Sequence, residues 1–408
     1  MAKLWMEVIQ YVYRLKRLPD ELINRDIVTL QAQTLIKPID RILQDVDWNS
    51  PDYIMRENLK KNMWLFSVAK NYNDCVAINN LLIREDGSLR PWHDFKREAQ
   101  KIAGNSARYL KTEYNTVVAG AQMSRKWQEI QRDKHLFPYV MFDVVNDRHT
   151  SDICRPLHNV IVTADDPMLM YYFPPNHFNC RTDVRRLRYG KPTEKYNLPN
   201  IPEAFKNNVG MSGSIFTDKN KYIENTPAEV LKNADTLHKI DILSKPRKEQ
   251  FRLLFEAENG GKVLEHLLLQ KGKDYDSILT SAIEFAKQGK TAEILPVINQ
   301  KELKEYRKSV FLDYDLNKNP DLRVDGVYYD IKEVESLKKI QRNANKASIQ
   351  GAVAIIQYNG EDLTQEAMEQ QVRRIFGANN IDKNGIHNYP YQLVYFLHKG
   401  KLYKYNRG

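Results

Sequence analysis

The chain has little cysteine, with only three such residues among 408: Cys75, Cys154 and Cys180. Three cysteines exclude the disulfide framework that holds small secreted domains together, and they suit a reducing compartment. The sequence also lacks any run of about 18 to 20 apolar residues, so we expect no transmembrane helix. The first residues carry charge and no small-residue cleavage site follows them, so we expect no secretory signal.

The length of the chain is sufficient for two or three domains, each with its own core. There are 62 Lys and Arg residues against 52 Asp and Glu residues, which gives a formal net charge of +10. An excess of this size favours polyanionic partners such as nucleic acid, because binding releases counterions.

The pattern of apolar residues divides the chain. Up to about residue 131 they recur at helical spacing, and we expect long helices over residues 52–72 and 91–130. A strand-like run over residues 137–145 then leads into a loop-rich segment. Residues 189–260 are rich in Lys, Asn, Pro and Gly, which predicts a connector with helices near 227–234 and 246–257.

The last third of the chain has a different order of elements. We expect a helix ending near Gly289, a strand over 291–295, a hairpin, a helix over 337–349 and a strand over 352–358. A helix over 364–376 and strands over 392–397 and 401–405 follow. This order predicts an α/β domain with helices packed on one central sheet.

The hairpin carries the charged residues of greatest interest. Asp325-Gly326 is a strong signal for a two-residue turn that needs positive φ angles, and it joins strand-like residues on either side. Period-two alternation places Asp330 and Lys332 on the same face of the second strand, and the turn brings Asp321 back toward them. Two carboxylates could hold a hard divalent cation, and the lysine could stabilise charge in phosphodiester hydrolysis. A solvated strand edge is the simpler alternative.

The spacing of Pro320-Asp321 and Asp330-Ile331-Lys332 resembles the PD-(D/E)xK signature of the restriction-endonuclease-like fold. Residues from Leu264 onward also resemble the C-terminal tRNase domain of the contact-dependent inhibition toxin CdiA. The features that match are Gly260-Gly261, the helix around Glu284, Ile294-Leu295-Pro296, Asn319-Pro320-Asp321, the Asp325-Gly326 turn and Asp330-Ile331-Lys332.

These resemblances imply that Glu284, Asp321, Asp330 and Lys332 carry the chemistry. The three acids would bind Mg²⁺ or Mn²⁺, although an ion pair with Lys287 is an alternative role for Glu284. No second glutamate beside Asp330 serves as a further ligand, so one or two metal ions remain possible. Basic residues Lys346, Arg373 and Arg374 are candidates for holding substrate phosphates.

A second candidate site lies in the loop-rich segment. Cys154, His158, His177 and Cys180 are spaced so that two thiolates and two imidazoles could close a tetrahedral Zn²⁺ site. Buried reduced cysteines with hydrogen-bonded histidines are the alternative. A basic run from Arg181 to Lys191 follows, and it would contact DNA or form a solvated face.

This segment resembles the Mu F-like phage head morphogenesis, or minor head, proteins over about residues 94–222. The matching residues include Asp147-Arg-His-Thr150, Leu157-His158, Pro174-Pro-Asn-His177 and Asn179-Cys-Arg181. The usual Cys-Arg-Cys reads Cys180-Arg181-Thr182 here, which removes one potential metal ligand. The resemblance implies a structural protein of a tailed phage or prophage that joins the procapsid near the portal.

We therefore expect an α+β multidomain protein. A mostly helical head module would span 1–225, a connector 226–260, and an α/β restriction-endonuclease-like nuclease domain 261–408. The expected function is a minor head protein with a tRNA-cleaving toxin domain, found in the capsid interior of the virion and in the host cytoplasm during assembly. Its partners would be the portal and other capsid proteins, tRNA or another nucleic acid, and an immunity protein, without a membrane.

Two alternatives remain open. The first is a purely structural head protein whose C-terminal domain has no catalytic activity. The second is a metal-independent ribonuclease of the barnase, EndoU or RelE-like group, in which His266, His387 and His398 would be the candidates for general acid or base.

Overall fold

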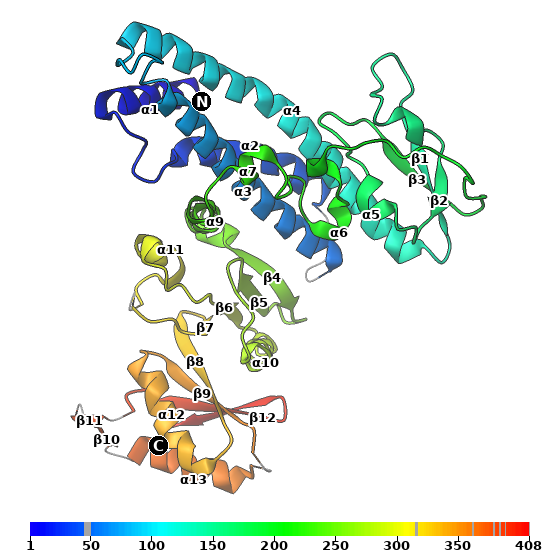
Figure 1. Ribbon diagram of the computed structural model, residues 1–408. Helices are drawn as coiled ribbons and strands as arrows, with labels where there is room; N and C mark the ends of the chain where they lie inside the picture. Colours follow the sequence, from blue (N-terminus) through cyan, green and yellow to red (C-terminus); the bar gives the residue numbers. More distant parts are fainter. Residues whose placement is uncertain are drawn as a thin grey trace. The chain divides into compact units, whose positions relative to one another are not determined.

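The computed structural model describes residues 1–44, 50–314, 317–360, 363–377, 380–382, 385–387 and 389–407, with side chains of 380–387 outside the described part. The chain forms two compact units, Met1–His238 and Lys239–Gly408. The first is mainly helical and the second is rich in strands, as an α+β multidomain protein requires (Figure 1). No helix among these residues has both the length and the apolar character to cross a bilayer.

The first unit is built on long helices. They are α1 (Ala2–Leu15), α2 (Arg25–Ile42), α3 (Pro51–Asn80) and α4 (Trp92–Asp133). The two predicted long helices are thus confirmed as α3 and α4. Ser50 fixes the start of α3, because its hydroxyl accepts a hydrogen bond from the Tyr53 backbone N–H at 3.1 Å, and Pro51 suits the first helical position.

A buried ion pair joins two of these helices. The ammonium group of Lys70 on α3 lies 2.7 and 2.6 Å from the two carboxylate oxygens of Glu113 on α4. It also donates to the Ser106 carbonyl at 3.0 Å. Both charged side chains are nearly inaccessible to water, so each depends on the other for compensation of its charge.

A small sheet and short helices complete the first unit. The sheet has the order β2-β1-β3, with β1 (Tyr139–Asp143), β2 (Ile161–Thr163) and β3 (Asp183–Leu187), all antiparallel. The short helices are α5 (Leu169–Tyr172), α6 (Val209–Ser212), α7 (Lys221–Glu224), α8 (Ala228–Leu231) and α9 (Asn233–Leu243), which continues into the second unit.

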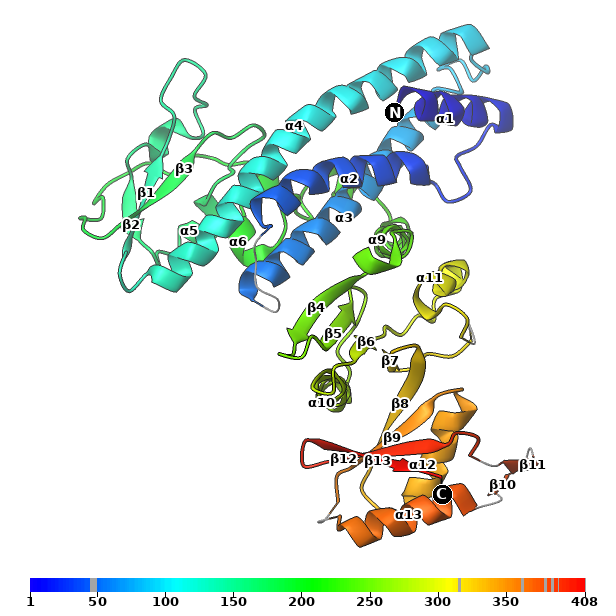
Figure 2. The same ribbon diagram turned by 180° about the vertical axis from the view of Figure 1, so that it is seen from behind.

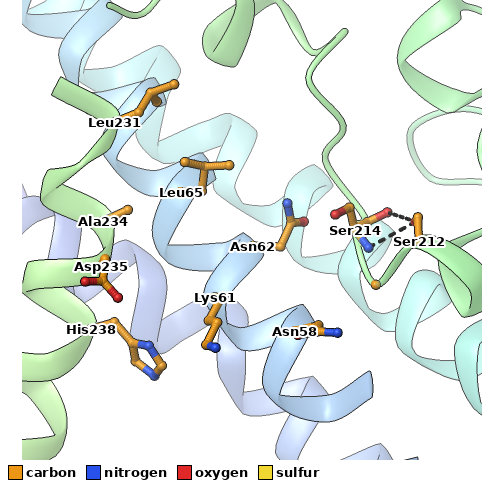
Figure 3. Close-up of a pocket in the computed structure, with 11 residues that line it drawn as sticks. Asn58, Lys61, Asn62, Leu65, Ser212, Ser214, Leu231, Ala234, Asp235 and His238 are labelled. Atoms are coloured by element: carbon orange, nitrogen blue, oxygen red, sulfur yellow. Dashed lines mark hydrogen bonds between the residues drawn. The ribbon is translucent and has the colours of Figure 1, made fainter. Parts of the chain in front are cut away.

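A pocket opens between α3 and the segments that follow the small sheet (Figure 3). Asn62 holds its wall together, since its side chain accepts the backbone N–H groups of Ile215 and Phe216 at 2.9 Å and donates to the Phe216 carbonyl at 2.8 Å. Ser212 and Ser214 hydrogen-bond with each other on the same wall. The Asn62 amide therefore anchors this loop to α3.

The second unit contains a mixed eight-stranded sheet with the order β13-β12-β9-β8-β7-β6-β5-β4. Its strands are β4 (Phe251–Glu256), β5 (Lys262–His266), β6 (Thr291–Ile294), β7 (Leu322–Val324), β8 (Val327–Val334), β9 (Val353–Tyr358), β12 (Leu393–His398) and β13 (Lys401–Asn406). The remaining elements are helices α10 (Tyr275–Ala286), α11 (Arg307–Phe311), α12 (Leu337–Ile349) and α13 (Gln365–Gly377), and the pair β10 (Asn380–Asp382) and β11 (Gly385–His387).

The two faces of this sheet carry separate cores. Tyr329 and Ile331 of β8 pack in one core with Phe285 of α10. Val334 of β8 packs in the other with Ile340 of α12, and both views show α12 beside β8 and β9 (Figures 1 and 2). Side chains alternate along a strand, so neighbouring residues of β8 face different helices.

The start of the second unit differs from the expected domain boundary. Residues 246–257, expected to form a helix in a connector, instead contain strand β4, which pairs with β5 through Phe251 and His266. Pairing at the sheet edge outweighs the helical pattern of this short segment. The compact unit therefore begins at Lys239, before the expected start at Gly261.

Candidate functional site

The predicted hairpin is present between β7 and β8. Asp325 and Gly326 both have positive φ, 46° and 93°, as a two-residue turn of this kind requires. Leu322 pairs with Tyr329 and Val324 with Val327. This register puts Asp321, just before β7, opposite the middle of β8, where Asp330 and Lys332 lie.

The hairpin brings these three charged groups together. The Asp321 carboxylate accepts a hydrogen bond from the Ile331 backbone N–H at 2.6 Å, and its own N–H donates to the Tyr329 carbonyl at 3.1 Å. The Lys332 ammonium lies 2.5 Å from Asp330 Oδ2. Asp330 is buried, with 2% of its surface exposed. We call Asp321 and Asp330 the acidic pair.

Burial changes the chemistry of the acidic pair. Removal from water raises the pKa of Asp321 well above its usual value, and the negative charge of Asp330 raises it further. The Ile331 N–H and the Lys332 charge oppose this rise. Two carboxyl groups forced together away from water gain stability from a shared proton or a cation. Such a pair is more typical of a functional site than of a solvated strand edge.

Glu284 does not join this cluster. Its helix, α10, covers the face of the sheet where Tyr329 and Ile331 pack. Asp330 and Lys332 alternate with those residues and face the side of α12. Glu284 instead forms an ion pair with Lys287 at 2.8 Å, the surface role that was its alternative. The geometry thus places Glu284 outside the acidic pair.

Glu333 also points away from the acidic pair, as expected, and accepts a hydrogen bond from the Ser277 hydroxyl of α10 at 2.6 Å. Across the described residues, no further Asp, Glu, His or Cys forms a three-ligand group with the acidic pair. Two carboxylates suit Mg²⁺, which commonly keeps several water ligands and binds through one or two carboxylates plus substrate phosphate. The donor set therefore fits such an ion.

A basic helix accompanies the site and was only partly recognised from sequence. Exposed cations lie along α12, and the helix contains no acidic residue. Lys338, Arg342 and Lys346 are spaced by one helical turn and so form one row. Only Lys346 of this row is expected from the sequence to hold phosphate, although the four-residue spacing of the row is visible there. Arg373 and Arg374, the other candidates for phosphate contact, are exposed on α13.

The three histidines proposed for metal-independent chemistry lie in different parts of the second unit. His266 is fully buried, with Nε2 lying 3.2 Å from Gln250 Oε1 and Nδ1 accepting the Leu268 N–H at 3.0 Å. Burial, followed by the charges of Arg247 and Arg252, lowers its pKa to about 3. His398 ends β12, and the side chain of His387 lies outside the described residues. The buried, hydrogen-bonded His266 is unsuited to acid–base work.

The Cys/His site of the first unit forms with three of its four expected residues. Cys154 Sγ lies 3.6 Å from Cys180 Sγ and 3.2 Å from His177 Nε2. A hydrogen bond with Cys154 lowers the pKa of Cys180 to about 4. His158 is not part of this group, and its ring contacts Asn159 at 3.2 Å. His158 therefore lies outside the three-residue group.

Ion pairs neutralise much of the basic run that follows. Arg181 binds Asp147, Arg185 binds Asp143 and Arg186 binds Asp133. Lys191 binds Glu194 at 2.7 Å. Because these basic side chains are already paired with acids, the run is better explained as a solvated face than as a DNA-binding surface.

Comparisons with known proteins agree with both resemblances. Residues 90–185 match the family described as Phage Mu protein F like protein. Residues 318–388 match the Contact-dependent growth inhibition CdiA C-terminal domain. The second match contains Asp321, Asp330 and Lys332 but not Glu284. Two segments of the protein are thus similar to a phage head-protein family and to a CdiA toxin-domain family.

One curated relative is the Putative capsid assembly protein F of Escherichia phage Mu. It is 31% identical over 101 residues, which cover 25% of this chain and 23% of that protein. The alignment thus spans less than a quarter of the relative's length. No solved structure matches the chain.

Proposed function

We propose that this protein is a minor head protein of a phage or prophage whose C-terminal unit is a divalent-metal-dependent ribonuclease, with tRNA as its substrate. The observation that carries the proposal is the acidic pair beside Lys332, in which Asp330 is buried and Asp321 is half-buried. Its placement on a hairpin, between helices on both sheet faces, supports a restriction-endonuclease-like fold for this unit. The match to the CdiA family supports a toxin role.

Asp321, Asp330 and Lys332 would have different roles in phosphodiester hydrolysis. Asp321 and Asp330 would hold Mg²⁺ or Mn²⁺ through oxygen, and the bound ion would supply an activated water and neutralise phosphate charge. Asp321 is held in place by the Ile331 N–H. Lys332, already within 2.5 Å of Asp330, would orient the attacking water or offset charge in the transition state.

The row of cations on α12 would bind the substrate backbone. Asp330 and Lys332 face the side of the sheet that this helix covers, so a phosphate chain along α12 would lie near the acidic pair. Lys338, Arg342 and Lys346 can contact successive phosphates without reading sequence. Selection of tRNA would then depend on its shape.

The segment that resembles head proteins suggests where the protein is located and which proteins it binds. We propose that the first unit joins the capsid near the portal, because residues 90–185 match the Mu F-like family and a relative is named a capsid assembly protein. The protein would then reside in the capsid interior and, during assembly, in the host cytoplasm. A toxin domain implies a cognate immunity protein as a further partner.

The decisive experiment incubates the full chain with total tRNA and, separately, duplex DNA, in Mg²⁺ or Mn²⁺. We expect tRNA cleavage that EDTA abolishes and that Asp330→Asn reduces at least ~10²-fold, the scale for losing one preorganised electrostatic group. Circular dichroism of the variant controls for folding. Absence of EDTA-sensitive cleavage by the wild type would favour a purely structural role, and full activity of Asp330→Asn would remove the site assignment.

A further inference from the structure

Three metal-binding side chains converge in the first unit, away from the nuclease site. Cys154 precedes the short turn Arg155–Leu157, while His177 and Cys180 lie in the loop between α5 and β3. Their ligand atoms all lie within 4.8 Å of one another. Both sulfur atoms are on buried residues, and His177 is half-buried. The group therefore joins two loops that are distant in the sequence.

Two separations between the ligand atoms lie within about 0.4 Å of those around a tetrahedral zinc ion. Zinc–sulfur and zinc–nitrogen bond lengths imply about 3.8 Å between two sulfurs and about 3.6 Å between sulfur and nitrogen. The Cys154–Cys180 separation is 3.6 Å and the Cys154–His177 separation is 3.2 Å. Small side-chain shifts would complete the geometry.

The histidine ring is already oriented for metal binding. His177 Nδ1 lies 2.8 Å from the Phe178 backbone carbonyl. A carbonyl can only accept, so Nδ1 carries the proton and Nε2 presents a lone pair toward Cys154. A hydrogen bond from the outer ring nitrogen is the usual support for a metal-bound histidine. This contact is independent of the cysteine spacing.

The fourth side of the group is lined by hydroxyls. Ser151 Oγ lies 2.8 Å from His177 Nε2 and accepts the Cys154 backbone N–H at 3.1 Å. Thr182 lines the same small pocket, with 5% of its surface exposed, and among the residues that the structure describes its hydroxyl has no hydrogen-bond partner of good geometry. A buried hydroxyl without a partner is costly unless water or another group completes the site.

We propose that Cys154, His177 and Cys180 bind one Zn²⁺ ion, and that solvent on the side of Ser151 and Thr182 supplies the fourth ligand. The ion ties the 151–154 loop to the 176–182 loop. These loops border a sheet whose strands have only three to five residues, so a metal crosslink would supply stability that the short strands do not. The ligand set is two thiolates and one imidazole, without His158.

The test uses the full chain, purified in reductant without chelator. Elemental analysis should give about one zinc per chain, as a site with thiolate ligands predicts. After exchange with Co²⁺, the protein should show the intense visible absorption of a tetrahedral cobalt site and a near-ultraviolet thiolate band. Cys180→Ser and His177→Ala should each lose the zinc. The matched control His158→Ala should keep it.

A gain-of-ligand variant covers the case in which ligand-loss variants fail to fold. Thr182→Cys would place a thiolate where solvent is proposed, so it should retain zinc against at least ~10-fold more chelator, within the range that changes around a metal site produce. Metal-free wild type with three reduced thiols would overturn the proposal. So would a single free thiol, which would indicate a Cys154–Cys180 disulfide, or zinc that survives in both ligand-loss variants.

Discussion

The half-buried carboxyl group of Asp321 lies beside the buried Asp330 in the second unit, and after burial the negative charge of Asp330 is the next cause that raises the pKa of Asp321. Asp321 also accepts the Ile331 backbone N–H at 2.6 Å. The hairpin thus holds the acidic pair in place at a cost in stability that a bound cation would relieve. We derive three predictions from this relationship and the charges of the second unit, and a fourth from the buried Lys70–Glu113 pair of the first unit.

The acidic pair should make the second unit less stable at higher pH. Since the pKa of Asp321 is raised on folding, the native state binds more protons than the unfolded state above the ordinary value of 3.8, and stability falls as pH rises through the raised pKa. Asp321→Asn keeps an acceptor for Ile331 and should raise the melting temperature in EDTA by at least ~2 °C at pH 8. The gain should shrink at pH 5. An equal gain at both pH values would contradict the raised pKa.

The Glu284→Gln variant distinguishes the metal-ligand role expected from the sequence from the ion pair with Lys287 that the structure shows. The Glu284–Lys287 pair is a surface interaction of about 0–1 kcal/mol, and it lies on the helix that covers the other sheet face. We expect the cleavage rate to stay within ~3-fold of wild type, against the large loss for Asp330→Asn. Steady-state rates on tRNA provide the measurement. A loss as large as that of Asp330→Asn would show that Glu284 reaches the site during catalysis.

The cations of α12 should affect binding more than chemistry. Replacement of Lys338, Arg342 or Lys346 by alanine should raise KM with little change in kcat. It should also reduce the slope of log affinity against log salt by about 0.7–0.9 for each phosphate that the variant no longer neutralises. Lys248→Ala, an exposed lysine just before β4 at the sheet edge, is the matched control. Equal effects of Lys248 and the α12 residues would indicate general electrostatic attraction without a defined path.

The Lys70–Glu113 pair should be essential to the helical unit. Lys70→Met leaves the Glu113 charge buried and unpaired, and should destabilise the unit by about 3–5 kcal/mol. The double variant Lys70→Met/Glu113→Gln removes both charges and should be more stable than Lys70→Met alone. Chemical denaturation followed through the tryptophans of this unit measures both. Additive losses in the double variant would show that the two residues act independently.

Much of the candidate site could be predicted from local sequence. Asp325-Gly326 determines the turn, the turn determines the register of β7 and β8, and period-two alternation then puts Asp330 and Lys332 on one face. The long helices α3 and α4 likewise follow from apolar spacing and from the cap at Ser50. Each of these features depends on residues close together in the chain, where backbone geometry leaves few choices.

The remaining features depend on contacts between distant segments. Glu284 lies apart from the acidic pair because α10 and α12 pack on opposite faces of the sheet, which the local sequence does not reveal. Pairing with β5 makes residues 251–256 a strand, and the path of the loop after Cys154 excludes His158 from the Cys/His group. The sequence by itself determined which charged residues meet on the hairpin. The tertiary structure decided which helix faces them, because burial of each core, and not local propensity, selects the side of the sheet on which a helix packs.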